Sequence, residues 1–168
     1  MLEGRPEPVV GARKRRILFL SVRNAARSLM AAAWLRQVGG EHFDVDSAGT
    51  QPAPVPHPVA VAVMYEVGID LSAARPRSST DLRGADYDLV IVLAPRDGAE
   101  SPHLDGAREV AYWSFDDPAS IDGPQQVQAF RRVRDELRTR VSLFVNATLP
   151  GPGTPALTPQ EQAQPGLG

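Results

Sequence analysis

The sequence ILFLSVRNAARS at residues 17–28 joins a short run of large apolar residues to a loop of small and polar ones. The run Ile17–Leu20 has the length and continuity of a strand that is buried on both faces. The loop leads directly into Ser28–Val38, a stretch rich in Ala, Leu, Met and Trp, and two glycines follow it, as they often follow a helix. This segment therefore predicts a central strand, a loop and a helix in direct succession.

Strand-length and helix-length segments alternate along the rest of the chain. The sequence His57-Pro58 precedes one predicted helix, with proline at an early helical position, and Gly68 stands just past its end. Alternation of strands and helices predicts an α/β fold, with a parallel sheet, helices on both faces and right-handed crossovers. The further predicted strands are Phe43–Asp46 (closing on the turn Ser47–Thr50), Asp88–Leu93 and Glu109–Trp113, and the further helices are Val59–Val67 and Gln125–Ala147.

The length of the chain indicates one domain. A chain of 168 residues with 42% hydrophobic content can bury one core and is too short for two ordinary domains. Residues 1–14 and 148–168 are rich in Pro, Gly and polar residues without apolar periodicity, and we expect both to be disordered. The predicted domain therefore spans residues 15–147.

Charge and composition exclude several classes of function. The formal net charge is −2, from 18 basic and 20 acidic residues, so no bulk field favours nucleic acid or an anionic membrane as a partner. The first residues do not read as a secretory leader, and no apolar run approaches the length of a bilayer span, so we expect a cytoplasmic protein. The chain has no cysteine, which excludes disulfides, thiolate metal sites, a thiol nucleophile and dithiol redox chemistry.

The loop after the first strand has the features of an anion site. It leads into the amino end of a helix, where unpaired N–H groups and the helix dipole attract an anion. Arg27 can donate to two oxygens of a tetrahedral anion, Asn24 tolerates a left-handed backbone, and Ser28 can cap the helix and donate toward Ser21. The alternative is an ordinary connection with an arginine facing solvent. The predicted oxyanion-binding residues are Val22, Arg23, Asn24, Ala25, Ala26, Arg27 and Ser28.

The pattern of this loop resembles that of the low-molecular-weight protein tyrosine phosphatases, which carry Cys, five residues, Arg, then Ser or Thr. The chain is similar, more closely, to the thioredoxin-coupled arsenate reductases that share their fold. This resemblance implies a three-layer α/β sandwich with a four-stranded parallel sheet, and a site for phosphate or arsenate. In family order, the matching segments are 22–28, Asp46–Thr50, Gly68–Arg75, Tyr87–Leu93, Phe115–Ala119 and Phe130–Leu137.

Three positions depart from the family pattern. Ser21 stands where the family has its nucleophilic cysteine, and Ala94 and Ser101 stand where arsenate reductases have two redox cysteines. Serine is not a thiolate, needs an adjacent general base to act as a nucleophile and cannot form a disulfide, and no histidine stands near Ser21 in the sequence. The resemblance thus implies thioredoxin as a partner only if cysteines are the native residues, and it implies no cofactor.

Asp117, which precedes Pro118, resembles the general acid of the family. Asp-Pro is also a common turn signal, so a structural role for Asp117 is the alternative. Asp116 is a second candidate one residue away.

The remaining polar residues carry weaker signals. His57 is expected to cap or precede a helix, while His42 and His103 lack metal-ligand spacing, so no metal site is predicted. Ser47 and Asp70 resemble positions at which some arsenate reductases hold potassium, but Ala32 replaces the glutamate that those proteins often carry there.

Three interpretations therefore stand. The chain is a cysteine-free form of an arsenate reductase or phosphatase, or a natural pseudo-phosphatase that acts as a binding or regulatory module, or a structural domain with a vestigial loop. The presence of Asn24, Arg27, Ser28 and Asp117 favours retained binding of phosphate, arsenate or sulfate. Catalytic turnover is not expected in any of the three.

Overall fold

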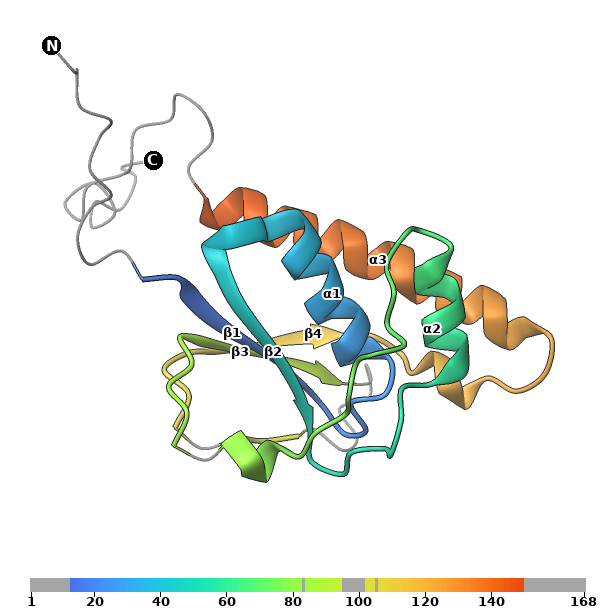
Figure 1. The fold of residues 1–168 in the computed structure, drawn as a ribbon, viewed down its shortest axis with the longest axis horizontal. Coiled ribbons are helices and arrows are strands. Elements are labelled where there is room, and N and C mark those ends of the chain that lie inside the picture. Colours follow the sequence, from blue (N-terminus) through green and yellow to red (C-terminus); the bar gives the residue numbers. More distant parts are fainter. Residues whose placement is uncertain (1–12, 83, 95–101, 105, 150–168) are drawn as a thin grey trace, which may run out of the picture.

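The computed structural model describes residues 13–82, 84–94, 102–104 and 106–149 (Figure 1). Its centre is a sheet of four parallel strands in the spatial order β2-β1-β3-β4. This arrangement confirms the predicted four-stranded parallel α/β fold. The strands are β1 Arg15–Ser21, β2 Phe43–Gly49, β3 Leu89–Ala94 and β4 Val110–Ser114; the helices are α1 Arg27–Gly39, α2 Pro58–Tyr65 and α3 Gln125–Thr148, with short 3₁₀ helices η1 Gly40–His42, η2 Ser79–Leu82 and η3 Pro118–Ser120.

Strand β1 is the central strand. It pairs with β2 on one side and with β3 on the other, and residues 17–20 are completely buried. The chain runs from β1 to β2 and later returns to β3, so the strand order reverses at the carboxyl end of β1. Ligand sites in open parallel sheets lie at such reversals.

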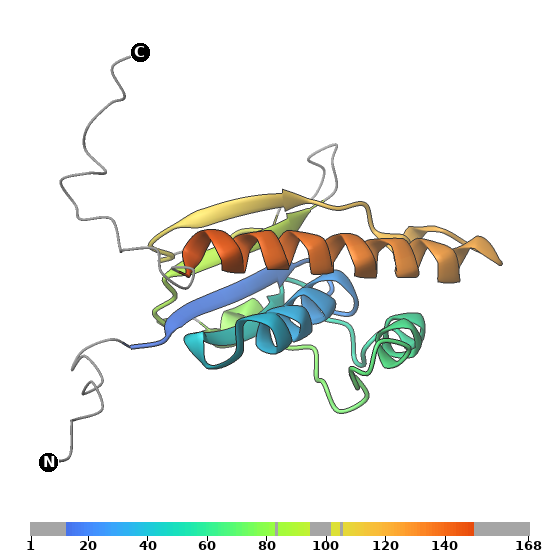
Figure 2. The same ribbon diagram turned by 90° about the horizontal axis from the view of Figure 1, so that it is seen from above.

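One face of the sheet is covered by α1 and α3, which lie side by side in Figures 1 and 2. Along α3, the side chains of Phe130, Val133, Leu137 and Val141 are buried at the predicted spacings of three and four. Helix α2 packs on α3 rather than on the sheet.

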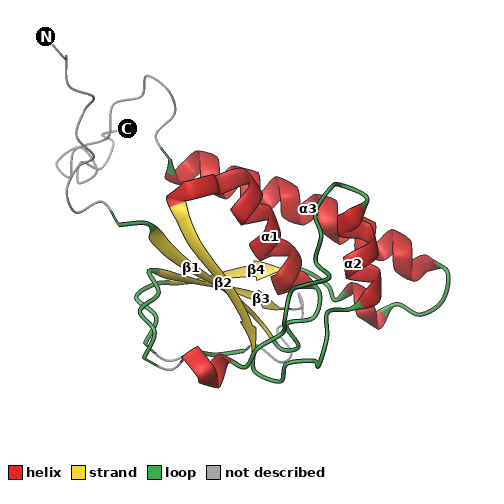
Figure 3. Cartoon of the chain, in the orientation of Figure 1, coloured by secondary structure: helices red, strands yellow, loops and turns green. Residues whose placement is uncertain are grey.

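The other face of the sheet has a lighter cover. Leu18, Leu20, Val90 and Val92 form a buried layer there with Tyr87. The sequence predicted helices on both faces, but among the described residues this layer is covered by Leu82 of the short helix η2 and by loop residues (Figure 3). No helix in the described part of the chain is long and apolar enough to cross a membrane.

Several element boundaries differ from those predicted, and two of these differences have a clear physical reason. The predicted turn Ser47–Thr50 is largely strand, because β2 continues to Gly49 and pairs there with Ser21 of β1. Helix α2 ends at Tyr65 rather than at Val67, because the N–H groups of Val67 and Gly68 donate to carbonyl groups three residues earlier, as in a 3₁₀ turn. The predicted disordered segments 1–14 and 148–168 lie almost wholly outside the described residues.

Candidate functional site

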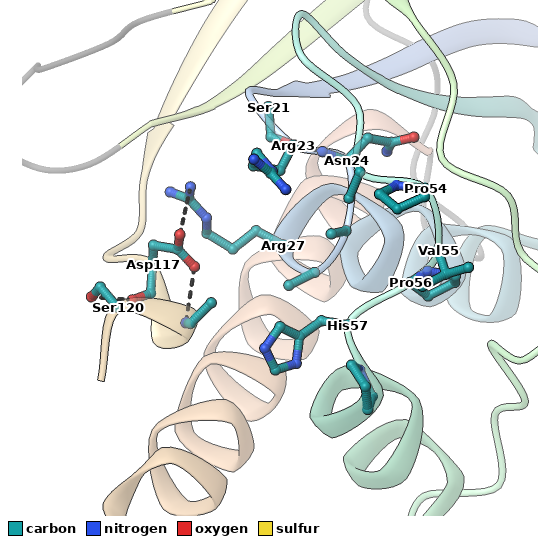
Figure 4. Close-up of a pocket in the computed structure, with 15 residues that line it drawn as sticks. Ser21, Arg23, Asn24, Arg27, Pro54, Val55, Pro56, His57, Asp117 and Ser120 are labelled. Atoms are coloured by element: carbon teal, nitrogen blue, oxygen red, sulfur yellow. Dashed lines mark hydrogen bonds and ion pairs between the residues drawn. The ribbon is translucent and has the colours of Figure 1, made fainter. Parts of the chain in front are cut away.

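A pocket of about 460 Å³ lies where β1 passes into α1 (Figure 4). The 21–28 loop forms one wall, and the segments 53–58 and 117–120 form the others. The structure thus brings Asp117 to the loop from a distance of 90 residues in the sequence. The lining residues are Ser21, Arg23, Asn24, Ala25, Ala26, Arg27, Ala53, Pro54, Val55, Pro56, His57, Pro58, Asp117, Ala119 and Ser120.

The 21–28 loop turns four of its carbonyl groups away from the pocket. The carbonyl oxygens of Ser21, Val22, Arg23 and Ala25 accept hydrogen bonds from backbone N–H groups of the segment 50–57, at 3.2, 2.8, 2.9 and 2.8 Å. In a trans peptide unit the N–H group points opposite to the carbonyl group. The N–H groups of the following residues therefore point into the loop. The N–H of Asn24 donates to Ser21 Oγ, and those of Val22, Arg23 and Ala26 are placed where an anion could accept their hydrogen bonds.

Helix α1 adds further donors at the same point. It begins at Arg27, and no side chain caps its first turn. The prediction that Ser28 caps this helix is wrong, because Ser28 already lies within the first turn and its hydroxyl is engaged elsewhere. The first N–H groups of the helix are thus left for a ligand or for water.

Ser21 and Ser28 lie in one buried hydrogen-bond network with Asn24. Their hydroxyl oxygens are 2.7 Å apart, and either hydroxyl can donate to the other. Ser21 Oγ accepts from the backbone N–H of Asn24 at 3.1 Å, and Ser28 Oγ accepts from Asn24 Nδ2 at 2.7 Å. The network fixes the hydroxyl of Ser21 at the base of the pocket. The predicted hydrogen bond between Ser28 and Ser21 is therefore present.

Asn24 is held in place from outside the loop. Its φ of 49° is the only positive φ of a non-glycine residue in the described part of the chain, as its predicted tolerance of a left-handed backbone allows. Asn24 Oδ1 accepts from the backbone N–H of Arg77 at 3.0 Å, and Arg77 O accepts from the N–H of Gly49 at 2.9 Å. The guanidinium of Arg77 is in turn paired with Asp46 at 2.8 Å. Arg77 therefore links the loop to the end of β2 through hydrogen bonds and an ion pair.

Gly49 lies against the loop so closely that we expect Gly49→Ala to destabilise the fold. A Cβ atom at this position would lie 2.6 Å from Val22 O and 2.9 Å from Asn24 N, both of which are backbone atoms. The loop would have to shift, so the free energy of unfolding should fall by about 1–3 kcal/mol. Urea denaturation measures this change.

Gln37→Ala is the control for this prediction. Gln37 is exposed on α1, so its truncation should change the free energy of unfolding by less than about 0.5 kcal/mol. A loss of stability in Gly49→Ala no larger than that in Gln37→Ala would contradict the predicted clash.

Arg27 reaches from α1 across the pocket. Its side chain is buried, and the residue is 8% exposed. Nη1 donates to the carbonyl oxygen of Phe115 at 2.8 Å, and Nη2 lies 3.9 Å from Asp117 Oδ2. Burial lowers the pKa of the guanidinium, whereas the carboxylates of Asp117 and Asp116 act in the opposite direction. An arginine remains charged under such a shift, so the pocket keeps a fixed cation.

Asp117 lies opposite the loop at the start of η3. Its Oδ1 accepts from the N–H of Ala119 at 3.0 Å, which caps this short helix, and its side chain is about one-third exposed, 37%. Asp117 therefore initiates a turn, as the structural alternative predicted, and it also lines the pocket, whereas its role as a general acid stays a prediction. Asp116 does not line this pocket but a smaller neighbouring one.

The structure places the positions of the missing thiols as follows. Ser21 is the last residue of β1, and Ala94 is the buried last residue of the neighbouring strand β3. Ser101 lies outside the described residues. Among the described residues, the hydrogen-bond partners of Ser21 Oγ are the Ser28 hydroxyl and the Asn24 N–H, and neither is a carboxylate or an imidazole.

The sequence did not indicate that His57 would line the pocket. Its Nδ1 accepts from the N–H of Val59 at 3.2 Å, which confirms its predicted place before a helix. In addition, its ring packs on that of Phe130 with centroids 4.7 Å apart, and its backbone N–H donates to Ala25 O. Nothing in its sequence neighbourhood revealed these contacts, because Phe130 lies on a helix 73 residues later.

The positions that resemble potassium ligands are engaged in other contacts. Ser47 O accepts from Arg77 Nε at 3.3 Å, and Asp70 Oδ1 accepts from the N–H of Ser72 at 2.8 Å. In the described part of the chain, no three histidine, aspartate or glutamate side chains are grouped so as to hold a metal ion.

Comparison with known proteins gives consistent matches. Residues 16–150 match the family model described as low molecular weight phosphotyrosine protein phosphatase. Arsenate reductases from Halalkalibacterium halodurans and Bacillus subtilis are 36% and 35% identical over 133 and 134 residues, covering 78% and 76% of this chain and 95% and 93% of theirs. A solved structure, "an arsenate reductase in the phosphate binding state", superposes with a TM-score of 0.67 at 30% identity, covering 79% of this chain and 98% of the other. These matches confirm the resemblance seen in the sequence.

Proposed function

This chain belongs to the low molecular weight phosphotyrosine protein phosphatase family, and from that premise we propose that it binds a tetrahedral oxyanion in its 21–28 loop. Phosphate, arsenate and sulfate share the required shape and charge. The proposal is a function of binding, without the thiol chemistry of the family.

The observation that carries the proposal is the direction of the loop's peptide units. Four carbonyl groups are held outward by the segment 50–57, so that the N–H groups behind them converge on the inside of the loop. A loop of this kind gathers several N–H donors at the uncapped start of α1. An anion satisfies these donors together, and a cation or an apolar group would not.

Arg27 supplies the fixed charge of the proposed site. One of its nitrogens is held by Phe115 O, which orients the planar guanidinium, and the group can then offer paired N–H donors to two anion oxygens. The hydroxyl of Ser21 can add a hydrogen bond from the base of the pocket, where a thiolate could only accept one.

We propose that the protein has no arsenate reductase or phosphatase turnover. Ser21 has no adjacent base among the described residues, and the chain has no cysteine for thioredoxin to reduce. The pocket extends beyond the loop to the segment 53–58 and so has room for more than a bare anion. This extension also supports a role as a regulatory module that binds a phosphorylated partner.

Arg27→Ala is expected to weaken phosphate binding about tenfold to a few hundredfold, because hydrogen bonds from a charged donor contribute about 1.5–3 kcal/mol each. Arg27→Lys should recover only part of the loss, since a lysine is a single point charge. Calorimetric titration of phosphate into the parent and both variants, at matched ionic strength, measures these effects.

Lys14→Ala is the control for the loss of one positive charge. Lys14 is exposed and precedes β1, so it lies about 20 Å from the loop at the other end of the strand. Saturable binding by the parent that is indifferent to Arg27 would place the anion elsewhere. Absence of phosphate binding by the parent would refute the proposed function and favour a structural domain with a vestigial loop.

A further inference from the structure

Arg23 is a second cation at the mouth of the same pocket. Its side chain is exposed, and it lines the pocket together with Arg27. In Figure 4 its guanidinium lies between Ser21 and Arg27, on the pocket side of the loop. Arg23 makes no ion pair with any described residue.

The two arginines differ in how they are held. Arg27 is buried and its side chain is held by a hydrogen bond to the Phe115 carbonyl. Its positive charge is partly balanced by the carboxylate of Asp117. Arg23 has its backbone carbonyl fixed by the N–H of Ala53, and the carboxylate that lines the same pocket, Asp117, is paired with Arg27 instead. Two guanidinium groups and one carboxylate line the pocket, so it keeps an excess of positive charge that attracts anions.

The pocket is larger than the interior of the loop. Its volume of about 460 Å³ falls within the range of roughly 300–1,000 Å³ that small organic ligands occupy. Beyond the loop it continues along Pro54, Val55 and Pro56, an apolar wall that a bare oxyanion would not use. The space therefore suits a ligand with a phosphoryl group and an organic part.

We propose that the ligand of this site is an organic phosphate that carries a second anionic group, such as a carboxylate. The phosphoryl group lies in the 21–28 loop against Arg27, and the second anionic group pairs with Arg23 at the mouth. This inference rests on the proposed function, because it assigns a ligand class to the same loop.

The test compares two ligands that differ in one anionic group. Ethyl phosphate and phosphoglycolate share the same P–O–C–C chain, and only phosphoglycolate ends in a carboxylate. The parent should bind phosphoglycolate about three to ten times more tightly, as expected for a partly exposed ion pair. Arg23→Gln should abolish this preference, because it should lower the affinity for phosphoglycolate more than the affinity for ethyl phosphate. Because Arg23 is exposed, the variant should keep the thermal stability of the parent.

Lys14→Gln should keep the preference, since it removes the same charge far from the pocket. Equal affinity of the parent for the two ligands would overturn the inference. So would an equal loss of affinity for both ligands in Arg23→Gln, because Arg23 would then bind the phosphoryl group itself. Either result leaves the proposed function standing as long as inorganic phosphate binds in an Arg27-dependent way, whereas absence of phosphate binding refutes both.

Discussion

Ser21→Cys is expected to convert a protein without measurable turnover into an aryl phosphatase. The sulfur would take the place of Ser21 Oγ, within reach of the Asn24 N–H and the Ser28 hydroxyl, which lie 3.1 and 2.7 Å from that oxygen. Donors of this kind, at a helix amino terminus and beside an arginine, lower a cysteine pKa from about 8.5 to about 3.5–7.5. A thiolate therefore forms at neutral pH, where the serine hydroxyl stays neutral.

The reaction of the variant needs no further group from outside. The thiolate would form a bond to phosphorus while the bond to the aryl oxygen breaks, and the family resemblance implies Asp117 as the acid that gives that oxygen a proton. Water would then attack phosphorus, the sulfur–phosphorus bond would break to release phosphate and the thiolate, and Asp117 would take the proton from the water. Release of a phenol from an aryl phosphate measures the turnover rate. This rate should reach roughly 1 s⁻¹ or more, the lower end of the usual range for enzymes.

The same variant should not reduce arsenate with thioredoxin. The resemblance to arsenate reductases implies that this chemistry needs two further thiols, at the positions of Ala94 and Ser101. Ser21→Cys/Arg27→Ala is the control, since it keeps the thiol and removes the anion's fixed charge, and it should lose most of the phosphatase activity. Catalytic arsenate reduction by Ser21→Cys alone would show that the assignment of Ala94 and Ser101 is wrong. A folded, phosphate-binding Ser21→Cys variant without phosphatase activity would contradict the assignment of Ser21.

Phe130→Ala is expected to lower the free energy of unfolding by about 3–5 kcal/mol. Phe130 is 0% exposed, and its ring packs on that of His57, which lines the pocket. The substitution leaves a cavity in the core between α3 and the start of α2. Because His57 loses the surface that supports its ring, phosphate affinity should fall as well. Urea denaturation and phosphate titration measure the two effects.

Leu143→Ala is the matched control on the same helix. Leu143 is 60% exposed, so its truncation should change the free energy of unfolding by less than about 0.5 kcal/mol and leave phosphate binding unchanged. A loss of stability in Phe130→Ala no greater than in Leu143→Ala would contradict the placement of Phe130 in the core.

The fold could be predicted because its signals are local. The apolar run Ile17–Leu20 and the strand within Asp88–Leu93 lie at the centre of the sheet, where both faces are covered, so continuous apolar runs suffice to identify them. The periodic spacing along Gln125–Ala147 likewise identifies α3 to within one residue. The end of β2 was misread as a turn because Ser47, Ala48 and Gly49 have little strand propensity, and their pairing with β1 decides their conformation.

The sequence alone also determined which residues form the 21–28 loop, since a strand, a loop with Asn24 and Arg27, and a helix follow one another without interruption. Tertiary structure alone decided what surrounds that loop. The segment 50–57 turns its carbonyl groups outward, Arg77 holds Asn24, and Asp117 arrives at 3.9 Å from Arg27. The physical reason is that hydrogen bonds between distant segments depend on sheet pairing and helix packing, which bring groups together irrespective of their separation in the chain, whereas propensity and periodicity report only on near neighbours.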